Sequence, residues 1–369
     1  MALCIRVPKP QGEAVRSKLI SEGKLDLGSR IHSDGDFLLI PIVGDSYEGF
    51  ETVEAEVESQ ERHPTDYREI AEVPDNLKDI LPSSFDVVGD VAMIKLPEEL
   101  LPYKESIGKA LISVNRSIRT VFLDSGVKGE FRVRDLVRIA GAGPSETVHK
   151  EFGVRLWTDP AKVYFNPRLS SERSRIASQV KDGEIVIDMF AGVAPFGTVI
   201  CRMANPEKVY SIDLNPEAER FARINAEKNH ADRLVPMTGD SSELIYTLPM
   251  ADRVIMNLPQ IADRFLRYAM DRLKVGGVAH MYKIIEREAF PEFCESLVKE
   301  MAGLGFGIRI ESSELKTYSP TMSVYSLDIV RVSRRRPQFP IVNVYIQSTL
   351  RKYNGEQLSL NTNMSNITC

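Results

Sequence analysis

A short glycine-containing segment in the middle of the chain has the residues best suited to hold a nucleotide. It runs DMFAGVAPFG from Asp188 to Gly197, with Gly192 at its centre, and it follows an apolar run that predicts a strand. Small residues in such a turn let a nucleotide or nucleoside approach the backbone, where a Cβ would clash. Any tight strand-to-helix turn also favours glycine, so the segment alone is a weak indication.

Two acidic residues follow the next two predicted strands. Asp213 comes 21 residues after Gly192, where a carboxylate can accept hydrogen bonds from both hydroxyls of a ribose. Asp240, in the segment TGDSSEL, is placed to accept from an adenine amino group. Pro195 has no backbone N–H to donate to the pyrophosphate of a dinucleotide. Together these residues favour S-adenosyl-L-methionine over NAD as the cofactor.

The elements that must position these residues alternate between strand and helix. Strands are predicted over 184–190, 208–214, 233–240, 253–259 and 276–284, a helix over 290–305, and strands over 307–319 and 323–332. This order predicts an α/β fold with a Rossmann-like, doubly wound sheet. Ligands bind such sheets at the carboxyl ends of the strands. The fourth strand ends there in Asn257-Leu258-Pro259, which we therefore expect at the site.

Smaller α+β units are predicted before this sheet. The first, residues 1–65, has strands at 4–8 and 36–42 and a helix at 12–23. The run 51–75 is rich in acids, and we interpret it as a solvated connector. A second α+β part is expected over 70–165, the Rossmann-like domain over 166–335 and a poorly ordered tail over 336–369.

The segment 104–138 is basic, with eight lysines and arginines against four acids. Its strand-like runs, TVFLD and FRVRDLVRIAG, allow two interpretations. The charges could belong to a solvated strand face. Alternatively they could form a phosphate-facing surface, which adds affinity for nucleic acid without sequence information.

Composition limits the class of protein. The chain of 369 residues has a net charge of −5, so a nucleic-acid partner must be bound by local charge. No apolar stretch approaches the roughly 20 residues of a membrane-spanning helix, and no signal peptide is evident. The four cysteines lie far apart without a C-x-x-C pair. This pattern predicts a cytoplasmic protein without a zinc site or disulfide framework.

The motifs in their order resemble a known family. The blocks VYFNPRLSSERSRIA, VIDMFAGVAPFG, SIDLNP, GDSSEL and VIMNLP are similar to those of the archaeal and eukaryotic tRNA (guanine-37-N1)-methyltransferases over most of residues 120–330. The resemblance implies an enzyme that binds the anticodon stem-loop of tRNA, and the elbow through its N-terminal module. We expect the enzyme to be a monomer. One departure is Ala194, where the family has glycine; a positive φ would strain it.

The resemblance assigns roles to particular residues. Guanine N1 carries a proton at neutral pH, so its methylation requires a general base and a cation or donor at O6. By resemblance Glu172 is the base, Arg132 holds O6 and Asn257 orients the base edge. Cofactor contacts are implied for Arg173, Asp188, Gly192, Leu214, Ser241 and Pro259, besides Asp213, Asp240 and Asn257.

Plainer interpretations remain open for several of these residues. Glu172 could simply cap a helix N-terminus, and Arg132 could be an ordinary strand arginine. Arg168 could hold phosphate or be surface charge. Tyr164 and Phe165 could stack on a flipped base or pack in the core. His149 is interpreted as structural.

Alternative functions also remain. A related wybutosine-pathway transferase would use the same cofactor at the same position, moving an aminocarboxypropyl group or methylating a wyosine precursor. A non-catalytic RNA-binding protein would not need the carboxylates Asp213, Asp240 and Glu172. An NAD dehydrogenase would need a hydride-transfer constellation, of which the sequence gives no sign.

Overall fold

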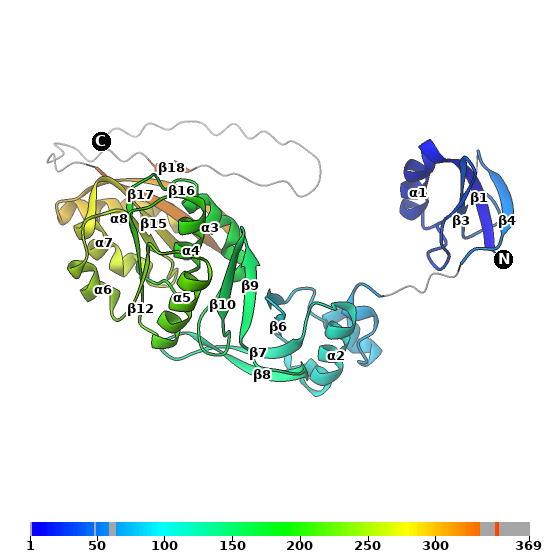
Figure 1. Cartoon of the computed structure of the whole chain (residues 1–369), viewed down its shortest axis with the longest axis horizontal. Helices are drawn as coiled ribbons and strands as arrows, with labels where there is room; N and C mark the ends of the chain where they lie inside the picture. Colours follow the sequence, from blue (N-terminus) through cyan, green and yellow to red (C-terminus); the bar gives the residue numbers. More distant parts are fainter. Residues whose placement is uncertain (1, 48, 59–63, 333–343, 347–369) are drawn as a thin grey trace. The chain divides into compact units, whose positions relative to one another are not determined.

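The computed structural model describes residues 2–47, 49–58 and 64–332, and the backbone of 344–346 (Figure 1). The chain divides into two compact units. The first comprises Met1–Leu81 and Glu105–Arg116, and the second comprises Pro82–Lys104 and Ser117–Cys369. The predicted tail, 336–369, lies outside the described residues except for the backbone of strand β18 (Val344–Ile346).

The first unit contains an antiparallel sheet of strand order β2-β3-β1-β4. Ile5, Leu19 and Ile40 are fully buried in its core. The predicted strands and helix of this unit are confirmed. Its elements are β1 (Ala2–Pro8), α1 (Gly12–Ser21), β2 (His32–Asp34), β3 (Phe37–Pro41), β4 (Glu51–Ala55) and α2 (Lys104–Val114).

The expected connector over 51–75 is wrong at its start. Residues Glu51–Ala55 form strand β4, which pairs along β1. Glu51 and Glu54 are exposed, whereas Val53 is partly buried. Strand pairing uses backbone groups, so an acidic face turned to solvent does not prevent an edge strand from forming.

The second unit is built on an eight-stranded sheet of order β13-β12-β11-β14-β15-β17-β16-β18. The first five strands are parallel, and β17 pairs antiparallel with both β15 and β16. All seven predicted strands are present. They are β11 (Ile185–Asp188), β12 (Lys208–Asp213), β13 (Leu234–Thr238), β14 (Ala251–Met256), β15 (Leu273–Glu286), β16 (Gly307–Thr317) and β17 (Met322–Val332).

Helices cover both faces of this sheet (Figure 1). Successive residues of a strand point to opposite faces. Accordingly Val186 joins one apolar core and Ile187 the other, and both are fully buried. The helices are α3 (Ser170–Ala177), α4 (Pro195–Met203) and α5 (Pro216–Lys228) on one side, and α6 (Ser241–Leu244), α7 (Leu266–Arg272) and α8 (Phe290–Gly303) on the other. The Rossmann-like prediction is confirmed.

Two smaller sheets complete the second unit. One has the order β5-β6-β7-β8, and the other is the hairpin β9-β10. Their strands are β5 (Asp86–Val88), β6 (Val91–Ile94), β7 (Thr120–Lys128), β8 (Val133–Gly141), β9 (Thr147–Glu151) and β10 (Val154–Thr158). The turn between β7 and β8 holds Arg132.

Three of the eight basic side chains of residues 104–138 are paired with acids of the protein. Arg119 contacts Asp90 at 2.8 Å, and Arg134 contacts both Asp124 and Asp86. Lys128 similarly pairs with an acid on β8. These pairs weaken the phosphate-surface interpretation for Arg119, Lys128 and Arg134, whereas the other five bases, Arg132 among them, form no ion pair within the described residues.

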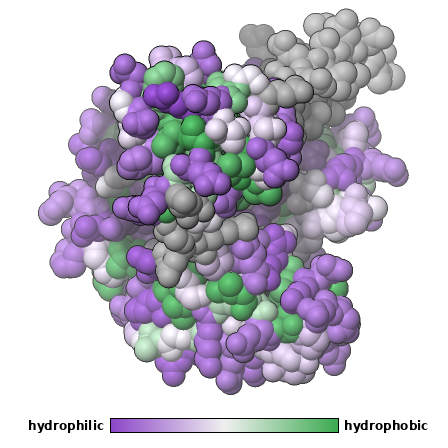
Figure 2. Space-filling view, turned by 90° about the vertical axis from the view of Figure 1, so that its right-hand side faces the viewer, coloured by the Kyte–Doolittle hydropathy of each residue, from purple (hydrophilic) through white to green (hydrophobic). Residues whose placement is uncertain are grey.

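The surface drawn in Figure 2 is largely hydrophilic, with apolar residues in small groups. Within the described part of the chain, no helix combines the length and apolar character needed to cross a membrane.

Candidate active site

Two adjoining cavities lie around the carboxyl ends of the parallel strands. The first, of about 300 Å³, has walls from the loops that follow β11, β12, β13 and β14. The second, of about 540 Å³, extends from the same place toward β5, β7 and β16. We call them the first and the second cavity.

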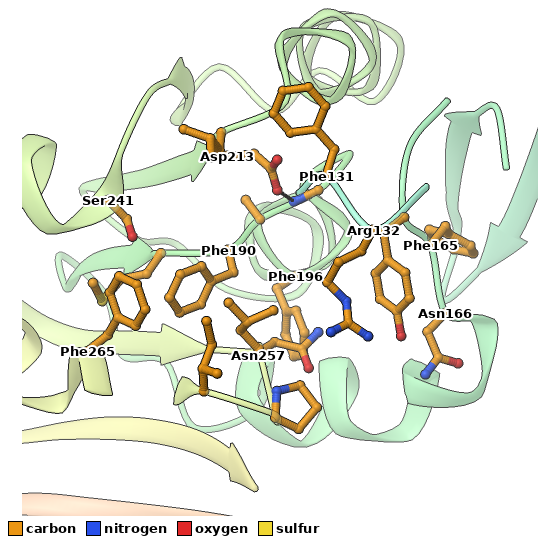
Figure 3. A pocket seen from close by; sticks show the side chains of 18 of the residues that line it. Phe131, Arg132, Phe165, Asn166, Phe190, Phe196, Asp213, Ser241, Asn257 and Phe265 are labelled. Atoms are coloured by element: carbon orange, nitrogen blue, oxygen red, sulfur yellow. Dashed lines mark hydrogen bonds between the residues drawn. The ribbon is translucent and has the colours of Figure 1, made fainter. Parts of the chain in front are cut away.

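The first cavity brings together most of the predicted site residues (Figure 3). Two predicted residues, Glu172 and Asp188, do not line it. Those that do are Arg132, Arg173, Gly192, Asp213, Leu214, Asp240, Ser241, Asn257 and Pro259.

The glycine loop and Asp213 hold each other in place. The Gly192 N–H donates to Asp213 Oδ2 at 2.7 Å, and the Asn215 N–H donates to Oδ1 at 2.9 Å. Gly192 has φ +54°, and a Cβ there would lie 3.1 Å from the carbonyl oxygen of Tyr164. Burial raises the pKa of Asp213. Each carboxylate oxygen keeps a further lone pair, so Asp213 can still accept from ribose hydroxyls.

Asp240 is fixed in a different way. It caps helix α6, where its Oδ1 accepts from the Ser242 N–H at 2.8 Å and from the Ser242 hydroxyl at 2.7 Å. The side chain is exposed and borders the first cavity, next to Ser241. Oδ2 makes no hydrogen bond to the described residues, which leaves it available to an amino group.

Aromatic residues that the sequence interpretation missed complete the first cavity. Phe190 and Phe265 both line it, with ring centroids 5.0 Å apart and an interplanar angle of 84°. Phe190 stands inside the predicted loop and could have been found there, whereas Phe265 is distant in sequence and has no local signal. Apolar walls with a few polar groups are typical of nucleoside sites, so the cavity fits S-adenosylmethionine.

Ala194 adopts the left-handed conformation that the sequence interpretation anticipated as a source of strain. It is the N-cap of α4, with φ +55° and ψ +46°, and it is fully buried. For a residue with a Cβ this conformation costs about 1–2 kcal/mol. Pro195 follows at the first helical position, where its missing N–H costs nothing.

The two cavities share a wall. Arg132, Tyr164 and Asn257 line both, so a ligand in one cavity would meet a ligand in the other at these side chains. The Arg132 guanidinium carbon lies 5.8 Å from the centroid of the Tyr164 ring. Arg132 forms no ion pair within the described part of the chain. Its charge is therefore available to a ligand (Figure 3).

Tyr164 and Phe165 differ in which of their two predicted roles, stacking on a base or packing in the core, the structure favours. Tyr164 is partly exposed in the shared wall, whereas Phe165 is 3% exposed and packs against His149 at 5.3 Å between ring centroids. His149 itself lies 3.6 Å from Glu151.

Two arginines near the site are held by acids. Arg173, only 1% exposed, donates to both carboxylate oxygens of Glu151, from Nε at 2.5 Å and from an Nη at 2.6 Å. Arg168 donates to Asp86 Oδ1 at 2.8 Å beside the second cavity. Both therefore support the walls through protein contacts.

Glu172 lies behind the cavity walls. Its neighbour Arg173 lines the first cavity, and Tyr282, whose hydroxyl contacts Glu172, lines the second. Arg175 Nε donates to Glu172 Oε2 at 2.9 Å, and the Tyr282 hydroxyl donates to the same oxygen at 3.1 Å.

Asp188 is also buried, at the end of β11. Burial, together with the nearby charge of Asp213, raises the pKa of Asp188 to about 8. Its Oδ2 has no hydrogen-bond partner in the described structure. Among the described residues, no group of three or more His, Cys, Asp or Glu side chains could hold a metal ion.

Family models cover most of the described chain. The chain matches the TRM5/TYW2 methyltransferase domain over residues 147–310, the TYW2 N-terminal domain over 68–144 and the tRNA methyltransferase 5 N-terminal domain over 4–51.

Individual proteins of this kind are also similar. The tRNA (guanine(37)-N(1))-methyltransferase Trm5b of Pyrococcus abyssi is 41% identical over 338 residues, which is 90% of this chain and 100% of that protein. The tRNA(Phe) (4-demethylwyosine(37)-C(7)) aminocarboxypropyltransferase of Pyrococcus horikoshii is 29% identical over 265 residues, covering 70% of this chain and 92% of that protein.

Solved structures agree with these matches. The complex of aTrm5 and tRNALeu superimposes with a TM-score of 0.70 at 32% identity, covering 90% of this chain and 100% of that one. P. horikoshii TYW2 in complex with MeSAdo gives a TM-score of 0.61 at 27% identity, covering 72% of this chain and 98% of that one.

Proposed function

Because this chain belongs to the TRM5/TYW2 family of tRNA-modifying transferases, we propose that it methylates N1 of guanosine 37 in tRNA with S-adenosylmethionine. One observation carries the proposal. The wall shared by the two cavities contains Arg132, Tyr164 and Asn257, so a methyl donor and a base could meet there.

The first cavity holds the cofactor, which supplies an activated methyl group on a sulfonium. Asp213 accepts from the ribose hydroxyls, and Asp240 accepts from the adenine amino group. Gly192 permits close approach of the backbone, and the Phe190 and Phe265 rings provide apolar walls. The protein then mainly aligns the reacting atoms, which is the larger part of catalysis when the donor is already activated.

The second cavity receives the base. Guanine must leave the stack of the anticodon loop before its N1 edge can be reached. The Arg132 guanidinium stabilises the negative charge that develops on O6, and the Asn257 amide hydrogen-bonds the base edge. Tyr164, which lies against Arg132, offers a ring on which the base can stack.

Glu172 removes the N1 proton in this proposal. The Glu172 side chain does not line either cavity, so the base must approach the Glu172 carboxylate as it binds in order to bring N1 within hydrogen-bond reach. Contacts between a general base and the proton it removes often reach their full geometry only when the substrate is bound.

The remaining proposals concern the whole protein. The chain acts as a monomer in the cytoplasm, and its second unit binds the anticodon stem-loop. The sheet of residues 1–65 contacts the tRNA elbow. Light scattering of the enzyme with and without tRNA tests the stoichiometry.

The aminocarboxypropyl transferases are the rival function. Their P. horikoshii member is less similar than the Trm5b methyltransferase, at 29% against 41% identity. The Asn257-Leu258-Pro259 loop and Glu172 also favour methylation, because both address a base nitrogen that must lose a proton.

Mapping of the product separates these functions. Unmodified tRNA transcripts are incubated with the enzyme and labelled cofactor, and the modified nucleoside is identified by mass spectrometry. We expect 1-methylguanosine at position 37, lost when G37 is replaced by adenosine. An aminocarboxypropyl adduct, a methyl group on another base, or label that persists after the replacement would contradict the proposal.

A further inference from the structure

A chain of buried and partly buried polar groups stands behind Glu172. It runs from Arg253 on β14 through His280 on β15 and Asp328 on β17 to Arg175 on α3. Tyr282, also on β15, contacts Glu172 directly. His280 and Tyr282 are two residues apart on β15 and therefore share one face of the sheet. His280 is directly opposite Asp328 in the strand pairing.

The hydrogen bonds of this chain have one consistent direction. Arg253 Nη1 lies 3.1 Å from His280 Nε2 and can only donate, so Nε2 accepts. Nδ1 then carries the hydrogen and donates to Asp328 Oδ1 at 2.7 Å. Burial lowers the pKa of His280, which is consistent with a neutral ring.

Asp328 in turn fixes Arg175. Its Oδ2 accepts from Arg175 Nη1 at 2.7 Å, which leaves Arg175 Nε directed at Glu172. Burial opposes the ionised form of Asp328, yet the hydrogen bonds from His280 and Arg175 hold its pKa well below the usual range.

The chain ends on one oxygen of Glu172. Both Arg175 Nε and the Tyr282 hydroxyl donate to Oε2, and no hydrogen bond from the described residues reaches Oε1. The carboxylate is thus clamped on one side while its other oxygen keeps all its lone pairs. This is the arrangement that a fixed proton acceptor requires.

Tyr282 connects this clamp to the site. It is only 1% exposed and lines the second cavity, and its ring lies 6.3 Å from that of Phe196, which lines the first. Burial and the charge of Glu172 raise the pKa of Tyr282 well above its ordinary value, so its hydroxyl remains a donor at neutral pH.

We propose that Tyr282 and Arg175, oriented by Asp328, are positioning residues that hold Glu172 Oε2 and reserve Oε1 for the proton of the base. This inference rests on the proposed role of Glu172 as the general base. It predicts that the Tyr282 hydroxyl affects methyl transfer only through Glu172.

The test is a double-mutant cycle of Tyr282→Phe and Glu172→Gln, measured as single-turnover methyl transfer to a tRNA transcript containing G37. Glu172→Gln should slow the step by roughly 10²–10⁴-fold. Tyr282→Phe keeps the ring and should slow it about 10- to 100-fold, the usual effect of losing a hydrogen bond to a charged group. In the Glu172→Gln background, Tyr282→Phe should have almost no further effect.

Two controls separate positioning from folding. Tyr246→Phe removes a similar bond, from the Tyr246 hydroxyl to Asp271 at 2.7 Å outside both cavities, and should leave the rate unchanged. Arg175→Lys should retain more activity than Arg175→Gln, because it keeps a charge beside Oε2. Cofactor affinity should be preserved in Tyr282→Phe, and its thermal midpoint should remain well above the assay temperature.

The outcomes are distinguishable. If Glu172→Gln leaves the rate unchanged, the proposed base is wrong. If the Glu172→Gln enzyme transfers methyl slowly but the Tyr282→Phe enzyme transfers it at the parent rate, only the positioning role of Tyr282 would be overturned. Equal effects of Tyr282→Phe in both backgrounds would also overturn it, because Tyr282 would then act independently of Glu172.

Discussion

Three aspartates of the second unit differ in how many hydrogen-bond donors the fold provides for their carboxylate oxygens. Asp213 accepts from two backbone N–H groups, and Asp328 accepts from His280 and Arg175. Asp188 is fully buried with one oxygen unpartnered. The charged form is stabilised where donors or cations compensate for burial and is disfavoured where they are missing. Burial raises the pKa of both Asp213 and Asp188, and it raises the pKa of Asp188, whose Oδ2 has no partner among the described residues, to about 8.

This raised pKa predicts a pH-dependent stability. Between about pH 4 and pH 8 the folded protein keeps the Asp188 proton whereas the unfolded chain has released it, so stability falls as pH rises through this window. Asp188→Asn removes this titration and should flatten the fall of the thermal midpoint. The exposed Asp182→Asn variant is the control and should follow the parent. Parallel curves for the Asp188 variant and the parent would refute the assignment.

At the scale of elements, the end of the β7–β8 hairpin is shaped to direct one side chain. The strand pairing shifts register between Asp124 and Val127, and Arg132 adopts φ +52° immediately before β8. Register shifts of this kind bend a hairpin and redirect its side chains. Here the result is a guanidinium in the wall shared by both cavities, at the cost of local backbone strain.

Replacing Arg132 should therefore lower activity whatever the new residue, whereas the effect on stability should depend on whether that residue tolerates a positive φ. Arg132→Gly and Arg132→Ala both remove the guanidinium and should both slow methyl transfer strongly. Only glycine relieves the positive φ, so Arg132→Gly should be more stable than Arg132→Ala by about 1 kcal/mol. Single-turnover rates and thermal midpoints of the two variants provide the comparison. Equal stability would show that the turn carries no strain, and unchanged rates would remove Arg132 from the O6 role.

At the scale of the whole molecule, a chain of net charge −5 has to bind a polyanion. Many cations near the site are neutralised by acids, as Arg134 and Arg168 are by Asp86. Lys95 and Lys316 line the second cavity and form no ion pair with the described residues. Burial and the charge of Arg168 lower the pKa of Lys316, which an approaching phosphate would reverse.

These two lysines should contribute to the salt dependence of tRNA affinity. Lys95→Ala and Lys316→Ala should each weaken binding and reduce the slope of log affinity against log salt by about 1, as expected for one lost phosphate contact. Lys299→Ala, on α8 with a side chain 75% exposed, serves as the control. Measurement of tRNA affinity over a series of salt concentrations decides this, and an unchanged slope would exclude the contacts.

The amino-acid sequence by itself determined the order of strands and helices and the residues at the strand ends. Apolar runs, glycines and prolines act locally, so the strands from 185 to 332, the loop at Gly192 and the carboxylates Asp213 and Asp240 could all be predicted from their neighbours in the chain. The acidic strand β4 was missed because its pairing with β1 depends on backbone bonds that side-chain charge does not reveal.

Only the tertiary structure decided which side chains meet. The contact of Phe190 with Phe265, the wall shared by Arg132, Tyr164 and Asn257, and the clamp of Tyr282 and Arg175 on Glu172 join residues from distant elements. Such contacts depend on the packing of α3 against the sheet and on the bent β7–β8 hairpin. Their geometry follows from how the elements pack together in three dimensions, which no local pattern along the chain specifies.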